Sequence, residues 1–568
     1  MNLAIQTRSD GWYIGGEQKL ALRVEAIESY RRNGYWANKT LGNLVEEAAR
    51  KWPARIALVS KERRLSFLEL DQLSTRLALG FLEIGLRPAD VVAVQLPNSI
   101  EHVLTIFALA KIGAVCNVIV PMMREKEVSH ILNHCKSRYI IIPRENSGYN
   151  YLDMVRKISG SIPSLQAIIV LGDTNSSEGV ISFNGLLNGA LKKDYAPDHL
   201  RAFSPSPDAV SLVGFTSGTT AQPKAYLHTH NTEHFNSYCC LLADSLPFLG
   251  KPSVNLALPG FAWMYGRFCN LLVGVIGGAT TVIVDRMDPD TILAALKAEH
   301  PTHIHAAPVV YRSIVEGLLT LDEEVRSSLA VLNYAGSTIP HGLASQLRGI
   351  CDLVTCYGLS EVSPVCSTSI MDAPEAQMYA SGRPSWGNKV AIIDEKGAPV
   401  GPGERGEIAM KGPGLFLGYL GQPDETAKAF LENGFFKTGD SGFFDDALYL
   451  NITGRTKDVI DRGGIKFSAR EVEELILGNP KVKDVAVVGA PDKRLGEKAC
   501  AFVVMRDDAT ITLEELTAYL RQKGIATQKL PERLEKVDEL PYTPTGKLKK
   551  FLLRDRIAKI ISDEEGWT

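Results

Sequence analysis

The sequence predicts an α/β protein with largely parallel sheets, because short apolar runs alternate with helix-like segments along most of the chain. Residues 40–52 and 67–85 carry Leu, Ala and Ile at helical spacing, whereas residues 91–96 and 139–142 are short, apolar and strand-like. A second region of the same kind runs from residue 254 to residue 357. The chain has 568 residues, which exceeds what one compact core usually holds, so we expect at least two domains.

Residues 389–408 interrupt this alternation with short apolar runs that Gly and Pro break. Such a pattern is typical of antiparallel hairpins and predicts a small β-rich subdomain within the larger domain. Beyond it the mixed pattern returns, with helices expected at 469–477 and 513–523. We therefore expect an N-terminal domain of residues 1–455, built of parallel α/β subdomains plus this β-rich one. A smaller α+β C-terminal domain follows, at residues 456–568.

Charge and composition disfavour several classes of function. Lys and Arg number 62 against 65 Asp and Glu, which gives a net charge of −3. This balance provides no broad basic surface for nucleic acid or anionic membranes. The longest apolar run, residues 271–284, contains three glycines and is shorter than a membrane-spanning helix. The nine cysteines form no CxxC pair and the N-terminus has no signal-peptide core, so we expect a cytoplasmic protein with free thiols.

The stretch GFTSGTTAQPKAYLHTH, residues 214–230, has the composition of a phosphate-binding loop. An apolar run leads into it, hydroxyl side chains surround Gly218, and Lys224 follows. Small residues let backbone N–H groups face phosphate oxygens, hydroxyls donate to those oxygens, and a lysine offsets their charge. It is not a Walker loop, because Lys224 lies between Pro223 and Ala225. Taken alone, the stretch fits an ordinary Ser/Thr/Gly turn equally well.

Further motifs follow in a fixed order: YGLSE at 357–361, KTGD at 437–440, GRTKDVIDRGG at 454–464 and PTGK at 544–547. Together with the phosphate-binding stretch, this set resembles the adenylate-forming (ANL) superfamily, which contains acyl- and aryl-CoA ligases, peptide-synthetase adenylation domains and luciferase. The resemblance covers essentially the whole chain. Residues 31–59 and 460–476 look most like the aryl- or alicyclic-carboxylate CoA ligases and dihydroxybenzoate-AMP ligases.

The resemblance implies a site for ATP and Mg²⁺. The loop would hold the β- and γ-phosphates, Tyr357 would stack on adenine, and the Ser360 hydroxyl would meet the α-phosphate. Glu361 would bind Mg²⁺, with a hydroxyl such as Thr219 helping; out of context, Glu361 is an ordinary surface acid. The expected ATP- and AMP-binding residues are Thr216, Ser217, Gly218, Thr219, Thr220, Lys224, Gly336, Ser337, Thr338, Tyr357, Gly358, Asp440 and Arg455.

Asp440 and Arg455 have a clear chemical task in this reading. A carboxylate can accept both ribose hydroxyls, and a guanidinium can donate to ribose or phosphate. The alternative for an arbitrary Asp/Arg pair is a salt bridge at the domain boundary.

The resemblance also assigns catalysis and domain motion. Lys547 matches the family's catalytic lysine, which reaches the α-phosphate and the attacking carboxylate oxygen, and Ser360 and Glu361 complete the expected catalytic set. Lys457 matches the hinge about which a mobile C-terminal domain swings between two half-reactions. The expected CoA tunnel contains Gly463, Gly464 and His230, although His230 fits equally a role in packing or in orienting the backbone.

The segment ALPGFAWMYGRF bears on the acid that is activated. Hydroxybenzoate activators carry His-Asn where this chain has Ala262 and Trp263, and amino-acid adenylation domains place an Asp in this segment, so both substrates are disfavoured. Phe261, Trp263 and Met264 predict an apolar acyl pocket, although each fits equally as core. Arg267 either meets the second carboxylate of a diacid or forms a salt bridge on a helix surface.

The expected activity is that of an ATP-dependent carboxylate–CoA ligase with an apolar aliphatic, alicyclic or aromatic acid as substrate. The carboxylate attacks the ATP α-phosphorus to give an acyl-adenylate and pyrophosphate, and the CoA thiol then expels AMP. An acyl-AMP ligase that loads a carrier-protein phosphopantetheine is the alternative within the class. A non-catalytic nucleotide- or acyl-binding protein is the alternative outside it. The expected partners are the acid, ATP and CoA, without nucleic acid or a membrane span, and a homodimer is left open.

Overall fold

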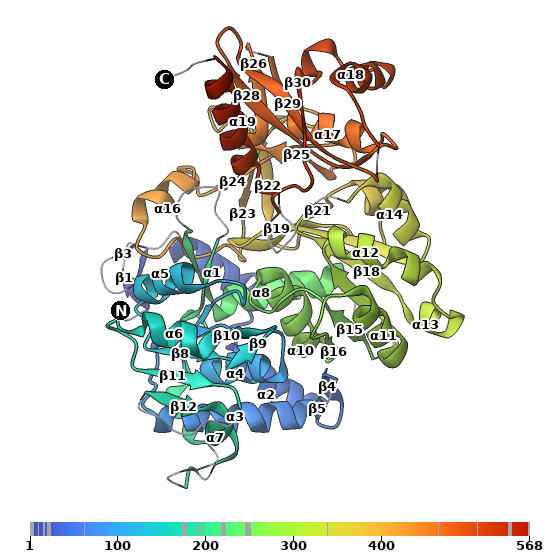
Figure 1. Cartoon of the computed structure of the whole chain (residues 1–568). Helices are drawn as coiled ribbons and strands as arrows, with labels where there is room; N and C mark the ends of the chain where they lie inside the picture. The colour runs from blue at the N-terminus through green and yellow to red at the C-terminus, as the bar shows by residue number, and fades with distance from the viewer. Residues whose placement is uncertain are drawn as a thin grey trace. The chain divides into compact units, whose positions relative to one another are not determined.

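The computed structural model divides the chain into two compact units (Figure 1). The large unit comprises Met1–Lys389 and Lys411–Phe430, and the small unit comprises Val390–Met410 and Leu431–Thr568. The structure describes all residues except 1–4, 9–10, 15–17, 20–23, 62, 173–178, 190, 192–193, 197, 217–222, 245–251, 338, 464, 508, 543–547 and 566–568. The β-rich residues 389–408 thus cluster mostly with the C-terminal residues, and the expected domain boundary at residue 455 stays a prediction.

The large unit contains a seven-stranded sheet in which the strands before the phosphate-binding stretch run parallel. Its order is β12 (Val180–Ser182), β11 (Ala167–Val170), β8 (Tyr139–Ile142), β6 (Val91–Val94), β7 (Val115–Val118), β13 (Val210–Phe215) and β14 (Ala225–Thr229). Every residue of β6 and β8 is buried, as expected for a parallel sheet that is covered on both faces. Only the last pair, β13 and β14, is antiparallel, and it flanks the predicted phosphate loop.

A second, nine-stranded sheet provides the other core of the large unit. Its order is β21 (Arg383–Pro384), β20 (Val362–Ser367), β19 (Asp352–Leu359), β18 (Val331–Ala335), β17 (His303–Ala306), β15 (Val254–Ala257), β16 (Thr280–Ile283), β4 (Ile56–Val59) and β5 (Arg64–Ser66). Strands β19 through β4 run parallel, and antiparallel strands close both ends. The expected α/β class with largely parallel sheets is confirmed.

Several helices of the large unit begin where the sequence provides a capping side chain. Thr40 caps α2 (Leu41–Lys51) and Ser66 caps α3 (Phe67–Glu83). In each case the cap hydroxyl accepts from the amide of the third helical residue, whose side chain accepts in return from the cap's amide. The other helices are α1 (Val24–Arg32), α4 (Ile100–Lys111), α5 (Glu125–Cys135), α6 (Tyr151–Ser159), α7 (Phe183–Asn188), α8 (His230–Ala243), α9 (Met264–Gly266), α10 (Val273–Gly277), α11 (Pro289–Glu299), α12 (Pro308–Leu319), α13 (Glu323–Ser328), α14 (His341–Arg348), α15 (Pro374–Tyr379) and α16 (Pro423–Ala429). No described helix is both long and apolar enough to cross a bilayer.

The small unit combines two sheets. One has the order β22 (Lys389–Ile393), β23 (Gly406–Lys411), β24 (Phe436–Phe444) and β25 (Leu450–Arg455), and its last two pairs are antiparallel. The other contains β27 (Ile465–Ser468), β26 (Val459–Arg462), β29 (Gly496–Met505) and β28 (Val482–Asp492), with β30 (Arg533–Lys536) parallel to β29.

The second sheet of the small unit has helices on both faces (Figure 1). Val485 and Val487 of β28 pack with α17 (Ala469–Leu477) and α18 (Leu513–Gln522). The intervening Ala486 and Val488 pack with α19 (Lys550–Glu565). Because successive side chains of a strand point to opposite faces, the apolar run of β28 supplies both cores.

Candidate active site

The predicted phosphate loop is closed by backbone pairing at its two ends. The Thr216 amide donates to the Lys224 carbonyl at 2.9 Å, and the Lys224 amide donates to Thr216 Oγ1 at 3.3 Å. Strand β13 reaches the loop at Phe215, which pairs with Ala225 at the start of β14. Of the expected phosphate ligands, Ser217, Gly218, Thr219 and Thr220 lie outside the described residues. Thr216 and Lys224, which we call the phosphate stem, therefore lie side by side where the predicted loop begins and ends.

The Lys224 ammonium group is held beside this stem. Its Nζ lies 2.6 Å from Glu425 Oε2 and 4.9 Å from the ring centroid of Tyr419. The pKa of Glu425 falls to about 2, because hydrogen bonds from Lys224 and then Lys428 stabilise its ionised form. Glu425 is in the first turn of α16, so this helix anchors the side chain that is predicted to offset phosphate charge.

The YGLSE motif spans the end of β19 and the turn into β20. Gly358 is required by close packing, because a Cβ there would lie 2.6 Å from Ser363 Oγ. The Ser360 carbonyl accepts a 2.9 Å hydrogen bond from His228 Nε2, and the Ser360 side chain hydrogen-bonds to the Tyr226 hydroxyl. Burial lowers the pKa of His228 to about 4, so the imidazole is neutral at physiological pH and donates from Nε2.

Glu361 is buried, with 8% of its surface exposed. Its Oε1 accepts a 2.7 Å hydrogen bond from the Tyr419 hydroxyl, and its carbonyl accepts one of 2.8 Å from the Phe416 amide. Among the residues that the structure describes, no Lys, Arg or His forms a salt bridge with this carboxylate. A buried, oriented carboxylate that pairs with no cation in the described part of the chain suits Mg²⁺, which proteins bind through one or two carboxylates together with substrate phosphates.

Gly336 and Ser337 leave the sheet beside the YGLSE motif. They follow β18, whose last residue, Ala335, pairs in parallel with Cys356, the neighbour of Tyr357. Both are exposed, and Gly336 has φ of 89° with open space where a Cβ would be. Parallel strands offer their carboxyl ends as ligand sites, so this edge agrees with the adenine pocket expected there. Thr338 lies outside the described residues.

Asp440 and Arg455 meet across two strands of the small unit. They are directly opposite in β24 and β25, and Arg455 Nε lies 2.8 Å from Asp440 Oδ1. The Asp440 side chain is 10% exposed and that of Arg455 is 46% exposed. The salt bridge that is the alternative for such a pair is present, and it leaves the Arg455 guanidinium partly exposed to solvent. Ribose binding by the two residues stays a prediction.

The predicted hinge is a single 3₁₀ turn. Thr456–Asp458 joins β25 to β26, which belong to different sheets of the small unit, and Lys457 is its middle residue. Gly463 turns the chain between β26 and β27 with φ of 61°, and its amide donates to the Leu495 carbonyl at 2.8 Å. Gly464 and the predicted catalytic Lys547 lie outside the described residues.

The structure places His230 in the core of the large unit. It is the first residue of α8, is 1% exposed, and its Nδ1 accepts a 3.2 Å hydrogen bond from the Leu41 amide. Burial lowers its pKa to about 4. These contacts are those of a residue that orients the backbone, which is the alternative to its expected place beside the CoA tunnel.

The candidate acyl-pocket residues are largely enclosed. Phe261 is fully buried and its amide donates to Asn98 Oδ1 at 2.8 Å. Met264 is 5% exposed, whereas Trp263 is half-buried, with its ring 2.5 Å from where a Gly260 Cβ would lie. Their role in binding an acyl group stays a prediction.

Arg267 forms a salt bridge, but in the core rather than on a helix surface. It is 1% exposed, within a π-helical segment (Arg267–Leu272), and its Nε bonds to Glu233 Oε2. Ser211 Oγ donates to the other Glu233 oxygen at 2.5 Å. Burial alone would raise the pKa of Glu233, yet the Arg267 charge and its hydrogen bonds bring that pKa below its usual value. With Glu233 as its partner, Arg267 does not need the substrate carboxylate that a diacid would supply.

Lys224, Ser360 and Glu361 are contacted by side chains to which the sequence alone assigned no role: Tyr226, His228, Tyr419 and Glu425. Tyr226 and His228 alternate along β14, and the side chains of residues i and i+2 share one face of a strand. That alternation was a usable signal. Tyr419 and Glu425 lie more than 190 residues from the loop in sequence, where no local pattern indicates the contact.

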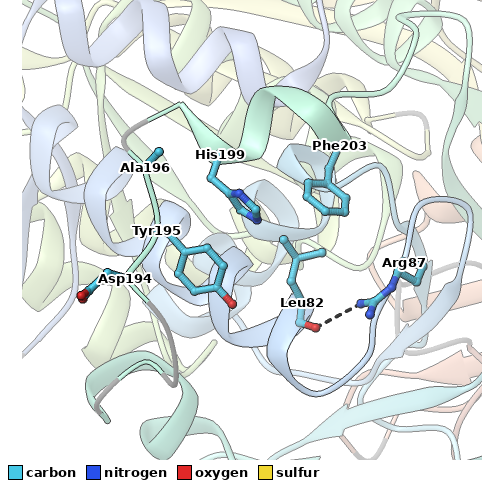
Figure 2. Close-up of a pocket in the computed structure, with 7 residues that line it drawn as sticks. All are labelled: Leu82, Arg87, Asp194, Tyr195, Ala196, His199 and Phe203. Atoms are coloured by element: carbon cyan, nitrogen blue, oxygen red, sulfur yellow. Dashed lines mark hydrogen bonds between the residues drawn. The ribbon is translucent and has the colours of Figure 1, made fainter.

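A pocket of about 330 Å³ lies elsewhere on the large unit (Figure 2). Tyr195, His199 and Phe203 point into it opposite Leu82 and Arg87. The Arg87 guanidinium donates to the carbonyls of Leu82 and Leu86 at 3.1 and 2.7 Å. None of the candidate site residues lines this pocket.

The stem of the predicted phosphate loop, the buried Glu361 and the residues that follow β18 all belong to the large unit, where the sequence predicts a nucleotide site. The family model described as AMP-binding enzyme matches residues 45–420, and the one described as AMP-binding enzyme C-terminal domain matches residues 471–547. The chain belongs to this family of AMP-binding, adenylate-forming enzymes.

Similar proteins and structures span nearly the whole chain. The medium-chain fatty-acid–CoA ligase of Escherichia coli K12 is 32% identical over 96% of this chain and 95% of that protein. The 2,3-dihydroxybenzoate-AMP ligase of Bacillus subtilis is 31% identical over 94% of this chain and 97% of that protein. The crystal structure of the anthranilate CoA ligase AuaEII with anthranoyl-AMP superposes with a TM-score of 0.81 at 24% identity, over 93% of this chain and 98% of that one. This last likeness supports the fold.

Proposed function

We propose that the protein is an ATP-dependent carboxylate–CoA ligase that acts through an acyl-adenylate. The observation that carries the proposal is the turn of Ser360 and Glu361, which is held by side chains that also contact the phosphate stem. The C-terminal family model extends to residue 547 and so includes the PTGK motif. The named relatives that match over most of their length include CoA ligases and aryl-AMP ligases.

The first half-reaction is a substitution at phosphorus. A carboxylate oxygen of the acid bonds to the ATP α-phosphorus, and the bond to the β-phosphate bridging oxygen breaks to release pyrophosphate. We propose that Lys224 offsets the β- and γ-phosphate charge, that the Ser360 hydroxyl donates to the α-phosphate, and that Lys547 steadies both reacting oxygens. Bound Mg²⁺, held by Glu361, would supply further charge stabilisation to the phosphates. The protein's share is positioning and electrostatics.

The second half-reaction is acyl transfer. The CoA thiolate attacks the carbonyl carbon of the acyl-adenylate, the C–O bond to phosphate breaks, and AMP leaves. We place the hinge at Lys457 and the path of the pantetheine arm beside Gly463 and Gly464. No protein nucleophile is needed, because AMP activates the carbonyl.

We further propose an apolar aliphatic, alicyclic or aromatic acid as substrate. Ala262 and Trp263 replace the His-Asn pair of hydroxybenzoate activators, and the adjoining Phe261 and Met264 are buried and apolar. We place the protein in the cytoplasm, which agrees with nine cysteines that are all free thiols. A homodimer is the assembly to test, by light scattering after size-exclusion chromatography.

The decisive experiment measures pyrophosphate release with a panel of acids, namely benzoate, cyclohexanecarboxylate and C4 to C12 fatty acids, and then CoA-thioester formation by mass spectrometry. We expect both products with at least one apolar acid. Pyrophosphate release without a thioester would contradict CoA as the acceptor and favour carrier-protein loading. No release with any acid would favour a non-catalytic binding protein.

A further inference from the structure

Two tyrosines lie side by side next to the YGLSE turn. Tyr226 of β14 and Tyr419 form an antiparallel bridge pair. Backbone hydrogen bonds flank the bridge, from the Leu417 amide to the Leu227 carbonyl at 2.9 Å and from the Leu420 amide to the Ala225 carbonyl at 2.8 Å. Residues 417–420 thus continue the sheet beyond β14. This pairing fixes the backbone positions from which the two tyrosine side chains extend.

Each tyrosine hydrogen-bonds to one of two consecutive candidate site residues. The Tyr226 hydroxyl bonds to the Ser360 side chain, and the Tyr419 hydroxyl donates to Glu361 Oε1 at 2.7 Å. Tyr226 and Tyr419 are 3% and 5% exposed, and burial raises the pKa of both phenols, so both stay protonated. Close packing also fixes Tyr226, because a Cβ at Gly214 would lie 2.2 Å from its hydroxyl.

Tyr419 has a second contact, through its ring. The Lys224 Nζ lies 4.9 Å from the ring centroid, within the range of a cation–π interaction, while Glu425 holds the same ammonium group at 2.6 Å. The Tyr419 ring is itself fixed, because Phe416 packs edge-on against it at 4.8 Å and the Tyr419 amide donates to Thr426 Oγ1 at 2.9 Å. One side chain therefore touches the candidate metal ligand and the candidate phosphate lysine.

We infer that Tyr419 is a positioning residue that holds Glu361 and Lys224 in register for a magnesium–nucleotide complex, with Tyr226 holding Ser360 beside them. The inference rests on the proposed function, which assigns Glu361 to Mg²⁺ and Lys224 to phosphate. A hydrogen bond to a ligating carboxylate orients the ligand, and its loss typically reduces metal affinity by about 10- to 100-fold. The two contacts of Tyr419 predict two separable effects, one on the metal and one on the phosphates.

The Tyr419→Phe variant isolates the hydroxyl, because it keeps the ring beside Lys224. We expect the Mg²⁺ concentration that half-saturates binding of a non-hydrolysable ATP analogue to rise about tenfold, while affinity for the analogue without Mg²⁺ is unchanged. Isothermal titration calorimetry at a series of Mg²⁺ concentrations measures both quantities without turnover. In ATP–pyrophosphate exchange, the apparent KM for Mg²⁺ should rise while the KM for the acid stays constant.

The Tyr419→Leu variant removes the ring as well. We expect it to lower affinity for the Mg²⁺-free analogue too, because Lys224 loses the aromatic face that holds it. The matched control is Tyr151→Phe, since Tyr151 is 2% exposed in the same unit and its hydroxyl donates to the Pro121 carbonyl at 2.7 Å, away from the candidate site residues. It should leave both affinities unchanged.

The outcomes distinguish this inference from the proposed function. If the unmodified protein makes acyl-adenylate and Tyr419→Phe shows the same Mg²⁺ dependence, the inference is wrong and the proposed function stands. If the unmodified protein binds no analogue, the proposed function fails and takes the inference with it. Should Tyr419→Phe not fold, Tyr226→Phe is the second test. It should raise the KM for ATP without changing the Mg²⁺ dependence. An unchanged KM for ATP would overturn the role of Tyr226 in holding Ser360.

Discussion

Arg267 and Glu233 show how single charged residues are accommodated in the core of the large unit. Their side chains are 1% and 0% exposed and form an ion pair that Ser211 supplements. Removing a charge from water is costly, and the pair is tolerated because each charge satisfies the other in a bonded geometry. Breaking it leaves the remaining charge without compensation.

We expect Arg267→Met to lower the free energy of unfolding by about 3–5 kcal/mol, because Glu233 would be buried without a partner. Urea unfolding followed by fluorescence measures this change. Glu233→Gln combined with Arg267→Met should recover part of the loss. The matched control is Lys157→Met, whose exposed pair with Glu125 at 3.5 Å should contribute under about 1 kcal/mol. Equal losses for Arg267→Met and Lys157→Met would contradict a special role of the buried pair.

At the scale of elements, β14 organises the candidate site. It begins at the end of the predicted phosphate loop, presents Tyr226 and His228 to the Ser360 turn, and leads into α8 at His230. The alternation of side chains along a strand explains why Tyr226 and His228 act on the same turn. A short strand thus positions residues from two distant parts of the sequence.

In the small unit, the 3₁₀ turn Thr456–Asp458 is the element that carries the predicted hinge residue Lys457. Lys457→Pro fixes φ near −65° and restricts the preceding residue, so it should block a dihedral change at this turn. We expect pyrophosphate release near the unmodified rate and CoA-thioester formation reduced at least about tenfold, since a hinge mutation acts on a conformational step. Lys457→Ala, which permits the motion, is the control, and equal loss in both variants would argue against a hinge.

Lys547→Ala should have the opposite profile in the same two assays. Acyl-adenylate formation should be nearly lost, while thioester formation from supplied acyl-adenylate should persist. An unchanged rate of acyl-adenylate formation would show that Lys547 is not the catalytic lysine.

At the scale of the whole molecule, several histidines are buried in a neutral form. Burial lowers the pKa of His102, His228, His230 and His234 from 6.5 to about 4. In the unfolded chain these residues take up protons as the pH falls below 6.5, but in the folded chain they do so only near pH 4. The unfolded state therefore binds more protons in this window, and stability falls as the pH is lowered through it.

We expect the free energy of unfolding of the large unit to fall as the pH is lowered from 6.5 to 4. Above pH 6.5 these histidines should leave it unchanged. Each of the four histidines should contribute about 1.4 kcal/mol per pH unit within the window. Urea unfolding at a series of pH values measures the slope. His234→Gln should reduce the slope by the contribution of one histidine, about 1.4 kcal/mol per pH unit. Replacing the exposed His341 by Gln should leave the slope unchanged. A flat stability profile from pH 6.5 to 4.5 would contradict this account.

The α/β class and many elements were predictable from local patterns. Helix α17 begins and ends where the spacing of apolar residues predicts, and β8 is the run of residues 139–142. The motifs likewise predicted membership of the adenylate-forming family, which the family models confirm. Periodicity and motif order are properties of short stretches, so one sequence is enough to read them.

Its motifs let the sequence predict which residues carry the chemistry expected of the family, such as Lys224, Glu361 and Asp440. The contacts of these residues are visible in the folded structure alone: Tyr419 and Glu425 reach Lys224 from about 200 residues away in sequence. The same holds for the buried pair of Arg267 and Glu233. Burial, charge pairing and hydrogen-bond geometry arise where helices and strands from separate parts of the chain pack together. No local pattern encodes those contacts, and they set how each chemical group is oriented and charged.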